Sequence, residues 1–478
     1  MTERERELEA FRTQAHALVD WMADYLRDIE RYPVRAAVQP REIIGKLPAS
    51  PPSDAESFER IFNDFREIIL PGMTHWQSPN FYAYFPANSS PPSILAEMLT
   101  ATLGAQCMSW ATSPAATELE ERMMEWLREM AGLPTSFTGV LQDTASTATL
   151  CSILTAREKK TGFAVNRLGF SPSMRFTCYA SSEAHSSIEK AVKIAGLGKE
   201  SLRAIAVDGD FAMIPDALDQ AIREDLARGF TPLCAVAALG TTGSTAIDPL
   251  RPIGEICARH ALWLHVDAAF AGSATILPEH RGMLDGVELA DTYVFNPHKW
   301  LFTNFDCSAY FVKDVEALVR TFEILPEYLK TAEAGTVNNY RDWGIQLGRR
   351  FRALKLWFVI RTFGLRGLQE RLRHHLALAA RQAERIRKDG RFEILAPVPL
   401  NTICFRYHPA GVDDPTLLNS LNARLLEAVN SSGKAYLTHT KLKGSFTIRM
   451  VIGQTSVEEE HVLATWDLIR GTAERMET

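Results

Sequence analysis

Short apolar segments alternate with helical patterns between residues 90 and 350 of this chain. Four of the apolar segments are predicted strands that end in small or polar residues, and they cover residues 139–142, 176–182, 233–239 and 263–269. Strands joined through helices run parallel, and helices then cover both faces of the sheet. The alternation therefore predicts an α/β fold around a mostly parallel sheet.

The regions before and after this block have different patterns. Residues 11–30 show helical apolar spacing, a proline-containing linker follows at 47–52, and residues 53–56 match a capping box for the next helix. After Leu347 a long amphipathic stretch leads to further predicted elements, which are strands near 392–395, 402–406 and 445–451 and a final helix from about 457. We expect three parts, namely an N-terminal helical segment (1–88), a large domain (89–355) and a small C-terminal α+β domain (356–478).

Composition and charge exclude several classes of protein. The 478 residues are 46% apolar and 23% charged, as in ordinary soluble enzymes. The net charge is −6 and Lys and Arg form no long run, so neither nucleic acid nor an anionic membrane is an expected partner. The charged start contains no apolar signal core, and no stretch approaches the ~20 apolar residues of a membrane helix, which predicts a cytoplasmic protein. Seven cysteines without CxxC spacing predict free buried thiols and no metal site.

Lys299 and Asp267 are the residues with the most informative chemistry. Asp267 lies near the end of a predicted strand, and Lys299 follows it in an Asn-Pro-His-Lys-Trp motif. The aldehyde of pyridoxal 5'-phosphate (PLP) forms a Schiff base with a lysine, and its ring nitrogen needs an acid nearby to stay protonated. Taken singly, a lysine is more often a surface charge and an aspartate a turn or cap residue. Other turns of the chain strengthen the PLP interpretation.

Three further turns have the composition of a ligand site. His185 lies between a predicted strand and residues 186–189, which match a capping box. The Gly-Thr-Thr-Gly turn at 240–243 lets the backbone approach a ligand, and the hydroxyl-rich helix start at 143–149 suits a phosphate. A loop-packed histidine and an ordinary N-cap cluster remain open alternatives. In open α/β sheets such turns line a crevice at the carboxyl ends of the strands.

The ordered motifs resemble those of the group II PLP-dependent decarboxylases, and within them the aromatic-L-amino-acid decarboxylases. The matching motifs are Asp-Thr-Ala-Ser-Thr (143–147), Ala-His-Ser-Ser (184–187), Leu-Gly-Thr-Thr (239–242), His-Val-Asp-Ala-Ala (265–269) and Asn-Pro-His-Lys-Trp (296–300). The similarity covers nearly the whole chain, including residues 73–79, 109–114 and 347–357. It implies PLP-dependent transferase fold type I with a seven-stranded-type sheet. It also implies a homodimer in which the N-terminal segment wraps the partner and the active site lies at the subunit interface.

The resemblance implies roles for individual residues. Lys299 would form the Schiff base with PLP, and Asp267 would pair with the pyridinium nitrogen. His185 would stack on one face of the ring and Ala269 would lie on the other. Further positions that match cofactor-binding ones are Ala145, Ser146, Thr242, Asn296 and His298.

Tyr328 matches the tyrosine that protonates Cα after carbon dioxide leaves, whereas related aldehyde synthases have phenylalanine there. A loop-packing aromatic is the plain structural alternative. With tyrosine at this position and histidine at 185, the resemblance implies an arylalkylamine as product. Decarboxylation-dependent oxidative deamination to an aromatic aldehyde is the alternative outcome.

The resemblance also implies a pocket for an aromatic side chain. Its positions are Trp76, Tyr84, Phe85, Pro86, Ala87, Gln106, Met108 and Gly348, with Gln106 and Met108 as candidates to reach the partner's pocket. Core packing is an equal alternative for each aromatic. Ala87 and Met108 depart from the well-studied animal relatives, which have threonine and phenylalanine. Gly348 leaves room for a large ring, which favours tryptophan without excluding phenylalanine, tyrosine or dihydroxyphenylalanine.

Other functions on the same scaffold differ in the residues they need. An aminotransferase usually needs an arginine for the substrate carboxylate, and a cysteine desulfurase needs a cysteine on a mobile loop; neither is evident. A catalytically silent PLP-fold binding protein is the alternative of another class. The joint presence of Lys299, Asp267, His185 and Tyr328 argues against it.

Overall fold

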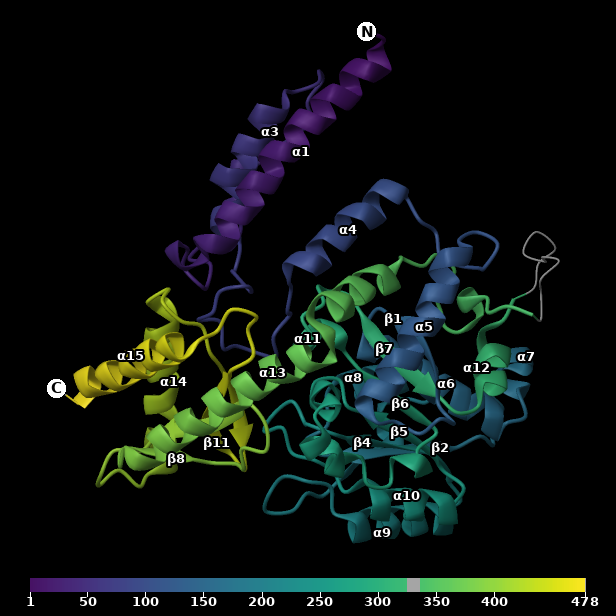
Figure 1. Cartoon of the computed structure of the whole chain (residues 1–478). Coiled ribbons are helices and arrows are strands. Elements are labelled where there is room, and N and C mark those ends of the chain that lie inside the picture. The colour runs from purple at the N-terminus through teal and green to yellow at the C-terminus, as the bar shows by residue number, and fades with distance from the viewer. Residues whose placement is uncertain (325–335, 478) are drawn as a thin grey trace. The chain divides into compact units, whose positions relative to one another are not determined.

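The computed structural model describes residues 1–324 and 336–477 and divides the chain into two compact units (Figure 1). The terminal unit contains Met1–Pro86, Glu384–Glu393 and Phe405–Thr478. The central unit contains Ala87–Ala383 and Ile394–Cys404. The predicted division into three parts stays a prediction.

A seven-stranded sheet forms the centre of the central unit, in the order β1-β7-β6-β5-β4-β2-β3. Its strands are β1 (Thr138–Gln142), β2 (Phe176–Ser181), β3 (Leu202–Ile205), β4 (Thr231–Ala238), β5 (Trp263–Asp267), β6 (Thr292–Phe295) and β7 (Ser308–Val312). Strands β3, β2, β4, β5 and β6 pair in parallel, whereas β7 is antiparallel to both β6 and β1. The predicted mostly parallel α/β sheet is confirmed. Because β1 and β6 both oppose β7, the carboxyl ends of β1, β2, β4, β5 and β6 lie at one edge.

Helices cover this sheet. The helices of the central unit are α4 (Pro91–Leu103), α5 (Pro114–Ala131), α6 (Ala145–Lys160), α7 (Ala164–Leu168), α8 (Ser187–Ile194), α9 (Pro215–Ala227), α10 (Leu250–Arg259), α11 (Pro297–Trp300) and α12 (Val315–Phe322). Helix α6 packs against α8, and α9 packs against α10. Figure 1 shows these two pairs on opposite faces of the sheet. The long α13 (Arg352–Lys388) changes direction at Gly364, whose φ of 64° suits a residue without Cβ.

The strands are apolar because both of their faces are covered. Strand β4 is buried at every residue after Thr231, and all five residues of β5 are buried. Each large apolar side chain removed from water in this way stabilises the fold by roughly 1.5–3 kcal/mol. The continuous apolar runs of β4 and β5 therefore reflect strands that are covered on both faces.

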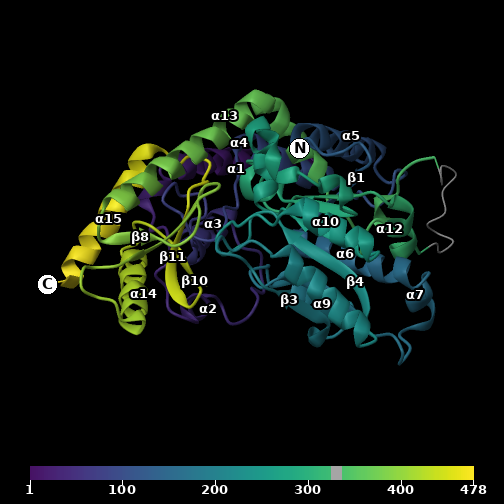
Figure 2. The same cartoon turned by 90° about the horizontal axis from the view of Figure 1, so that it is seen from below.

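The terminal unit combines the two ends of the chain. Its N-terminal helices are α1 (Glu3–Arg27), α2 (Glu42–Lys46) and α3 (Phe58–Asp64). Helices α1 and α3 lie side by side (Figure 1). Trp21 contacts Phe62 and Phe65 edge-on at ring distances of 5.8 and 5.3 Å. A four-stranded sheet follows in the order β10-β11-β9-β8, and its strands are β8 (Phe392–Ile394), β9 (Thr402–Tyr407), β10 (Thr438–Leu442) and β11 (Ser445–Val451). Ile394 of β8 and the first three residues of β9 are assigned to the central unit. Helix α14 (Pro415–Ser431) packs against β11 and α15 (Glu459–Glu477) (Figure 2).

Two predicted helix starts are wrong in detail. The capping box expected at 53–56 does not open a helix, since α3 begins at Phe58 and Ser57 accepts the hydrogen bond of its first turn. The capping box expected at Ser186 is also absent, because Ser186 has helical backbone angles and its side chain makes no cap hydrogen bond. A capping side chain requires an extended backbone at that residue, and the sequence pattern does not reveal this.

The structure also bears on the predictions about cysteines and membrane helices. All seven cysteines are buried thiols outside any disulfide bond, as expected. Within residues 1–324 and 336–477, no helix is long and apolar enough to cross a membrane.

The close packing of β1 leads to a test. A Cβ added at Gly139 would lie 2.2 Å from Met124 Cε and 2.9 Å from a ring carbon of Phe311. We expect Gly139→Ala to lower the free energy of unfolding by about 1–3 kcal/mol through overpacking. The urea midpoint of unfolding measures this, with Gly282→Ala as control, because a Cβ there meets nothing within 4 Å. Equal midpoints for the two variants would contradict the packing described.

Candidate active site

Lys299, Asp267 and His185 meet at the carboxyl edge of the central sheet. Asp267 is the last residue of β5, and it pairs in register with Val294 of β6. Lys299 follows β6 in the short helix α11, and His185 lies in the turn between β2 and α8. The charges of Asp267 and Lys299 both act on the His185 imidazole. The structure thus brings together three residues that are far apart in the sequence.

The His185 imidazole is held as a neutral ring. Partial burial lowers the pKa of His185 below its usual range, a nearby Asp267 carboxylate opposes this, and Lys299 adds to it. Nδ1 accepts a hydrogen bond from the Ser187 N–H at 3.2 Å, so the proton of the neutral ring lies on Nε2. The sequence predicted that Ser186 caps this helix, but the Ser186 side chain makes no cap hydrogen bond, and His185 accepts from the first N–H of α8, that of Ser187. A fixed, uncharged, flat ring suits stacking on a flat cofactor.

The Asp267 carboxylate is buried and oriented by backbone. Its Oδ1 accepts from the Ala269 N–H at 3.0 Å, and 9% of the residue is exposed. Its carbonyl accepts from the Leu239 N–H at 2.9 Å, which joins the ends of β5 and β4. Thr242 is exposed in the turn that follows β4. A carboxylate fixed in this way can stabilise a cationic heterocycle.

His298 is a second neutral histidine, directly before Lys299. Its Nδ1 accepts from the Cys307 N–H at 2.9 Å, which leaves the proton on Nε2. Burial lowers the pKa of His298 to about 3, and the positive charges of Lys299 and Lys355 act in the same direction. The buried side chain therefore offers a hydrogen-bond donor without adding charge beside the lysine.

The start of α6 and the end of β6 form the part of the site suited to a phosphate. Ala145 and Ser146 are the first two residues of α6, and the Thr144 side chain accepts from the Thr147 N–H at 3.3 Å. Asn296 Oδ1 accepts from the Ser308 hydroxyl at 2.7 Å, so its amide nitrogen is the donor side of the group. Backbone amides at a helix N-terminus with polar side chains beside them suit a phosphate. Sequence reasoning missed Ser308, because nothing in β7 marks it as a partner of Asn296.

A buried polar network lies beneath these residues and was also missed. His265, two residues before Asp267, bridges Thr149 of α6 at 3.1 Å and Thr292 of β6 at 2.8 Å. Thr292 in turn contacts Ser152 at 2.7 Å. Burial lowers the pKa of His265 to about 4. A histidine inside a predicted apolar strand was the available signal, and the network ties α6 to the strands that present Asp267 and Lys299.

Three of the predicted substrate positions lie together in the central unit. Gln106 Oε1 accepts from the Arg349 N–H at 2.8 Å, and the Met108 carbonyl accepts from the Arg341 N–H at 2.9 Å. A Cβ added at Gly348 would lie 3.2 Å from Gln106 Nε2. Gln106 and Gly348 are therefore neighbours, and Met108 lies two residues beyond Gln106. Ala87 is the first residue of the same unit.

The predicted aromatic positions belong to the terminal unit. Trp76 stacks on Tyr84 at a ring distance of 5.7 Å, and 36% of Trp76 and 49% of Tyr84 are exposed. The Arg449 guanidinium lies 5.3 Å from the Phe85 ring, and Pro86 ends this part of the unit. Their role in an aromatic pocket stays a prediction. Tyr328 lies outside the described residues.

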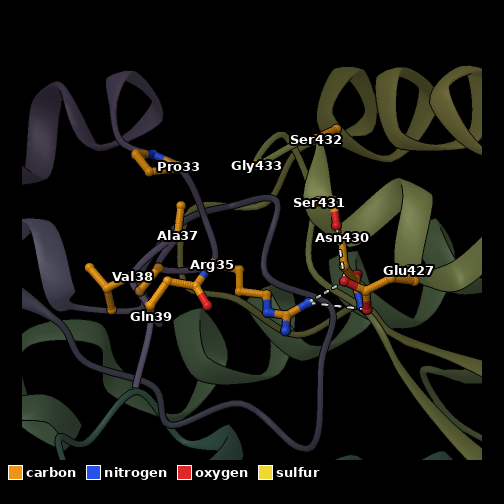
Figure 3. A pocket seen from close by; sticks show the side chains of 11 residues that line it. Pro33, Arg35, Ala37, Val38, Gln39, Glu427, Asn430, Ser431, Ser432 and Gly433 are labelled. Carbon is orange, nitrogen blue, oxygen red and sulfur yellow. Dashed lines mark hydrogen bonds and ion pairs between the residues drawn. The ribbon is translucent and has the colours of Figure 1, made fainter. Parts of the chain in front are cut away.

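A cavity of about 440 Å³ is also present in the terminal unit (Figure 3). Arg35 and Glu427 form an ion pair of 3.4 Å in its wall, and Ser431 donates a hydrogen bond to Glu427. None of the predicted site residues is among those that line it.

The buried His265 generates a prediction about pH. Between pH 6.5 and about 4 the unfolded chain binds a proton at this residue, whereas the folded chain does not. Stability therefore falls as the pH drops through this range, by about 1.4 kcal/mol per pH unit. We expect His265→Gln to flatten the decrease of the urea midpoint with falling pH. His16→Gln, at an exposed position of α1, should keep the wild-type slope. An unchanged slope in His265→Gln would contradict the prediction.

The residues present fit PLP by their chemistry. A lysine lies near a buried, oriented carboxylate and a neutral imidazole, and a helix N-terminus lies at the same edge of the sheet. A small side chain, Ala269, follows the carboxylate in the turn after β5. This combination supplies an amine, an acid for a ring nitrogen and donors for a phosphate.

Comparison with known proteins agrees with this chemistry. The model of the pyridoxal-dependent decarboxylase conserved domain matches residues 40–408. The chain is 42% identical to tryptophan decarboxylase TDC2 of Camptotheca acuminata, over 99% of this chain and 96% of that protein. It is also 42% identical to a phenylacetaldehyde synthase of Petunia hybrida (98% and 95%) and to tyrosine decarboxylase 2 of Narcissus pseudonarcissus (97% and 94%). The crystal structure of Oryza sativa TDC with PLP and tryptamine has a TM-score of 0.95 and 37% identity, and the match covers 98% of this chain and 99% of that one. The chain belongs to the family of pyridoxal-dependent decarboxylases.

Proposed function

We propose that this protein removes the carboxylate of aromatic L-amino acids as carbon dioxide and yields the arylalkylamine. The observation that carries the proposal is the meeting of Lys299, Asp267 and His185 at the carboxyl edge of the sheet. Relatives 42% identical to the chain are named tryptophan and tyrosine decarboxylases, which supports an aromatic substrate. Tryptophan, phenylalanine, tyrosine and dihydroxyphenylalanine are the candidate substrates.

Each residue of the site has a proposed task. Bound PLP supplies an electron sink for the bond that breaks when the carboxylate leaves. Lys299 is the amine that holds the cofactor aldehyde, and Asp267 stabilises the protonated ring nitrogen. His185 stacks on the ring opposite Ala269, and the neutral His298 donates a hydrogen bond beside Lys299. Ala145, Ser146, Thr242 and Asn296 are proposed to hold the rest of the cofactor.

We propose that the substrate ring contacts the eight positions that the resemblance implies. These residues are Trp76, Tyr84, Phe85, Pro86, Ala87, Gln106, Met108 and Gly348. A side chain at position 348 would crowd Gln106 Nε2 at 3.2 Å. Glycine avoids this crowding and so supports a ring as large as indole.

A second copy of the chain is the proposed partner. Helix α1 has no buried residue, and 56% of Leu8 and 61% of Phe11 are exposed. On α4, Leu95 and Leu99 are exposed to 52% and 47%. Apolar stripes of this kind are typical of interfaces, which supports a homodimer with the active site near the contact. A monomeric mass in sedimentation velocity would contradict it. Seven free cysteines support the proposed cytoplasmic location, where thiols stay reduced.

Formation of an aldehyde is the second candidate function, because a phenylacetaldehyde synthase is as similar as the decarboxylases. In that reaction oxygen and water convert the amino acid to aldehyde, carbon dioxide, ammonia and hydrogen peroxide. Tyr328 favours the amine, since a phenol can donate the proton that Cα needs. A phenylalanine at this position could not donate it.

The first test is carbon dioxide release from each of the four candidate amino acids. We expect activity in the wild type and a loss of more than about a thousandfold in Lys299→Ala, because covalent catalysis needs the amine. Borohydride should reduce the Schiff base of the wild type. The absorbance band near the edge of the visible range should then disappear, and the cofactor should stay covalently attached to Lys299. Lys160→Ala, which replaces an exposed lysine at the far end of α6, is the matched control and should keep wild-type turnover. Full activity in Lys299→Ala would refute the mechanism.

The second test concerns the product. Tyr328→Phe removes the proposed proton donor, so we expect amine yield to fall and aldehyde, ammonia and hydrogen peroxide to rise. Amine, aldehyde, ammonia and hydrogen peroxide are measured in the same reaction, each as a ratio to the carbon dioxide released. An unchanged ratio of amine to carbon dioxide would exclude Tyr328 as the donor.

A further inference from the structure

A buried ion pair, Glu120 of α5 and Arg349, lies beside the proposed substrate positions and has no task in the proposed reaction. Its side chains are 3% and 5% exposed. Arg349 Nη2 lies 2.6 Å from one carboxylate oxygen of Glu120, and Nη1 lies 3.2 Å from the other. A buried ion pair adds little net stability compared with apolar residues of similar size. The pair is therefore weak evidence for a stabilising role.

Further hydrogen bonds of the pair go to the backbone of two other segments. Arg349 Nη2 donates to the Leu141 carbonyl at 2.7 Å, and Nη1 donates to the Cys107 carbonyl at 3.4 Å. Glu120 Oε1 accepts from the Leu141 N–H at 2.8 Å. The pair thus connects α5, the end of β1 and the segment around Cys107. Three chain segments take their relative positions from two side chains.

The same segments contain three proposed substrate positions. The Arg349 N–H donates to Gln106 Oε1 at 2.8 Å, and its carbonyl accepts from the Cys107 N–H at 3.0 Å. Met108 follows Cys107, and Gly348 precedes Arg349. Gln106 thus accepts a hydrogen bond from Arg349 itself. Met108 is next to Cys107, which Arg349 also contacts, and Gly348 is next to Arg349. A shift of Arg349 would move all three.

These segments also border the turn proposed to hold the cofactor phosphate. Gln142 Nε2 donates to the Trp343 carbonyl at 3.1 Å, and Gln346 Nε2 donates to Asp143 Oδ2 at 2.8 Å. Asp143 lies two residues before the first residue of α6. The chain that leads to Arg349 thus runs along the end of β1 and the start of α6.

We propose that Glu120 and Arg349 are positioning residues that set the place of Gln106, Met108 and Gly348, and so set selectivity among aromatic substrates. This proposal rests on the proposed function. A pair that only stabilised the fold would change stability and leave the preference between two substrates untouched. The ratio of kcat/KM for tryptophan to kcat/KM for tyrosine separates these cases. A smaller amount of folded protein lowers both values by the same factor and leaves their ratio unchanged.

The main variant replaces both charges, as Glu120→Leu with Arg349→Met. Loss of one partner leaves an unpaired buried charge, whereas apolar residues of similar size in place of both are usually tolerated. We expect a folded, PLP-binding protein in which kcat/KM for the preferred substrate falls about tenfold or more. The ratio between the two substrates should change by at least about threefold. Arg349→Lys keeps the charge without the two-pronged geometry, and should shift the ratio in the same direction.

The matched control is the pair Arg203 and Asp225, on β3 and α9, which is remote in the sheet from β1. It is also two-pronged, at 2.8 and 2.9 Å, and its aspartate is 2% exposed. Arg203→Met with Asp225→Leu should leave the substrate ratio at the wild-type value.

The outcomes are distinct. A wild-type ratio in the folded Glu120→Leu, Arg349→Met protein would overturn the positioning role. If that protein does not fold, a wild-type ratio in Arg349→Lys overturns it instead. An equal change in the control pair would also count against it, since any buried pair would then have the same effect. Failure of the wild type to release carbon dioxide from any aromatic amino acid would refute the proposed function itself.

Discussion

Hydrogen bonding between parallel strands is the interaction on which the candidate site depends. Strands β2, β4, β5 and β6 pair in parallel, and β7 reverses direction between β6 and β1. The carboxyl ends of the six strands β1 to β6 consequently share one edge. Asp267 is the last residue of β5, Lys299 lies in the short helix α11 after β6, and His185 lies in the turn after β2. Without this pairing no local feature would bring together a lysine and a histidine separated by more than a hundred residues.

Burial then determines the charge of the site. It lowers the pKa of His185, of His265 to about 4 and of His298 to about 3, so all three imidazoles are neutral near pH 7. Three nearby charged groups also affect the pKa of His185. Asp267 raises it, whereas Lys299 and Lys190 lower it. A neutral imidazole can stack or donate a hydrogen bond without adding positive charge beside a charged cofactor.

Much of this arrangement could be predicted because it rests on short-range patterns. Apolar runs bounded by turn residues located β1, β2, β4 and β5 to within two residues at each end, and the turns after them contained the site residues. Helix starts were less predictable. Ser53 and Ser186 match capping boxes in the sequence, but capping depends on backbone angles that the surrounding structure imposes. The ion pair of Glu120 and Arg349 was not predicted, although a glutamate at helical spacing between Thr117 and Met124 was a signal.

The sequence by itself determined the α/β class, the order of the strands and turns along the chain, and the residue types available for PLP chemistry, because these depend on periodicity and composition. Only the tertiary structure decided which atoms meet. It selected the nitrogen that bears the proton in His185 and His298, through the Ser187 and Cys307 amides. It also joined residues 106–108 to Arg349. Contacts between segments far apart in the sequence leave no periodic pattern, so the folded chain alone reveals them.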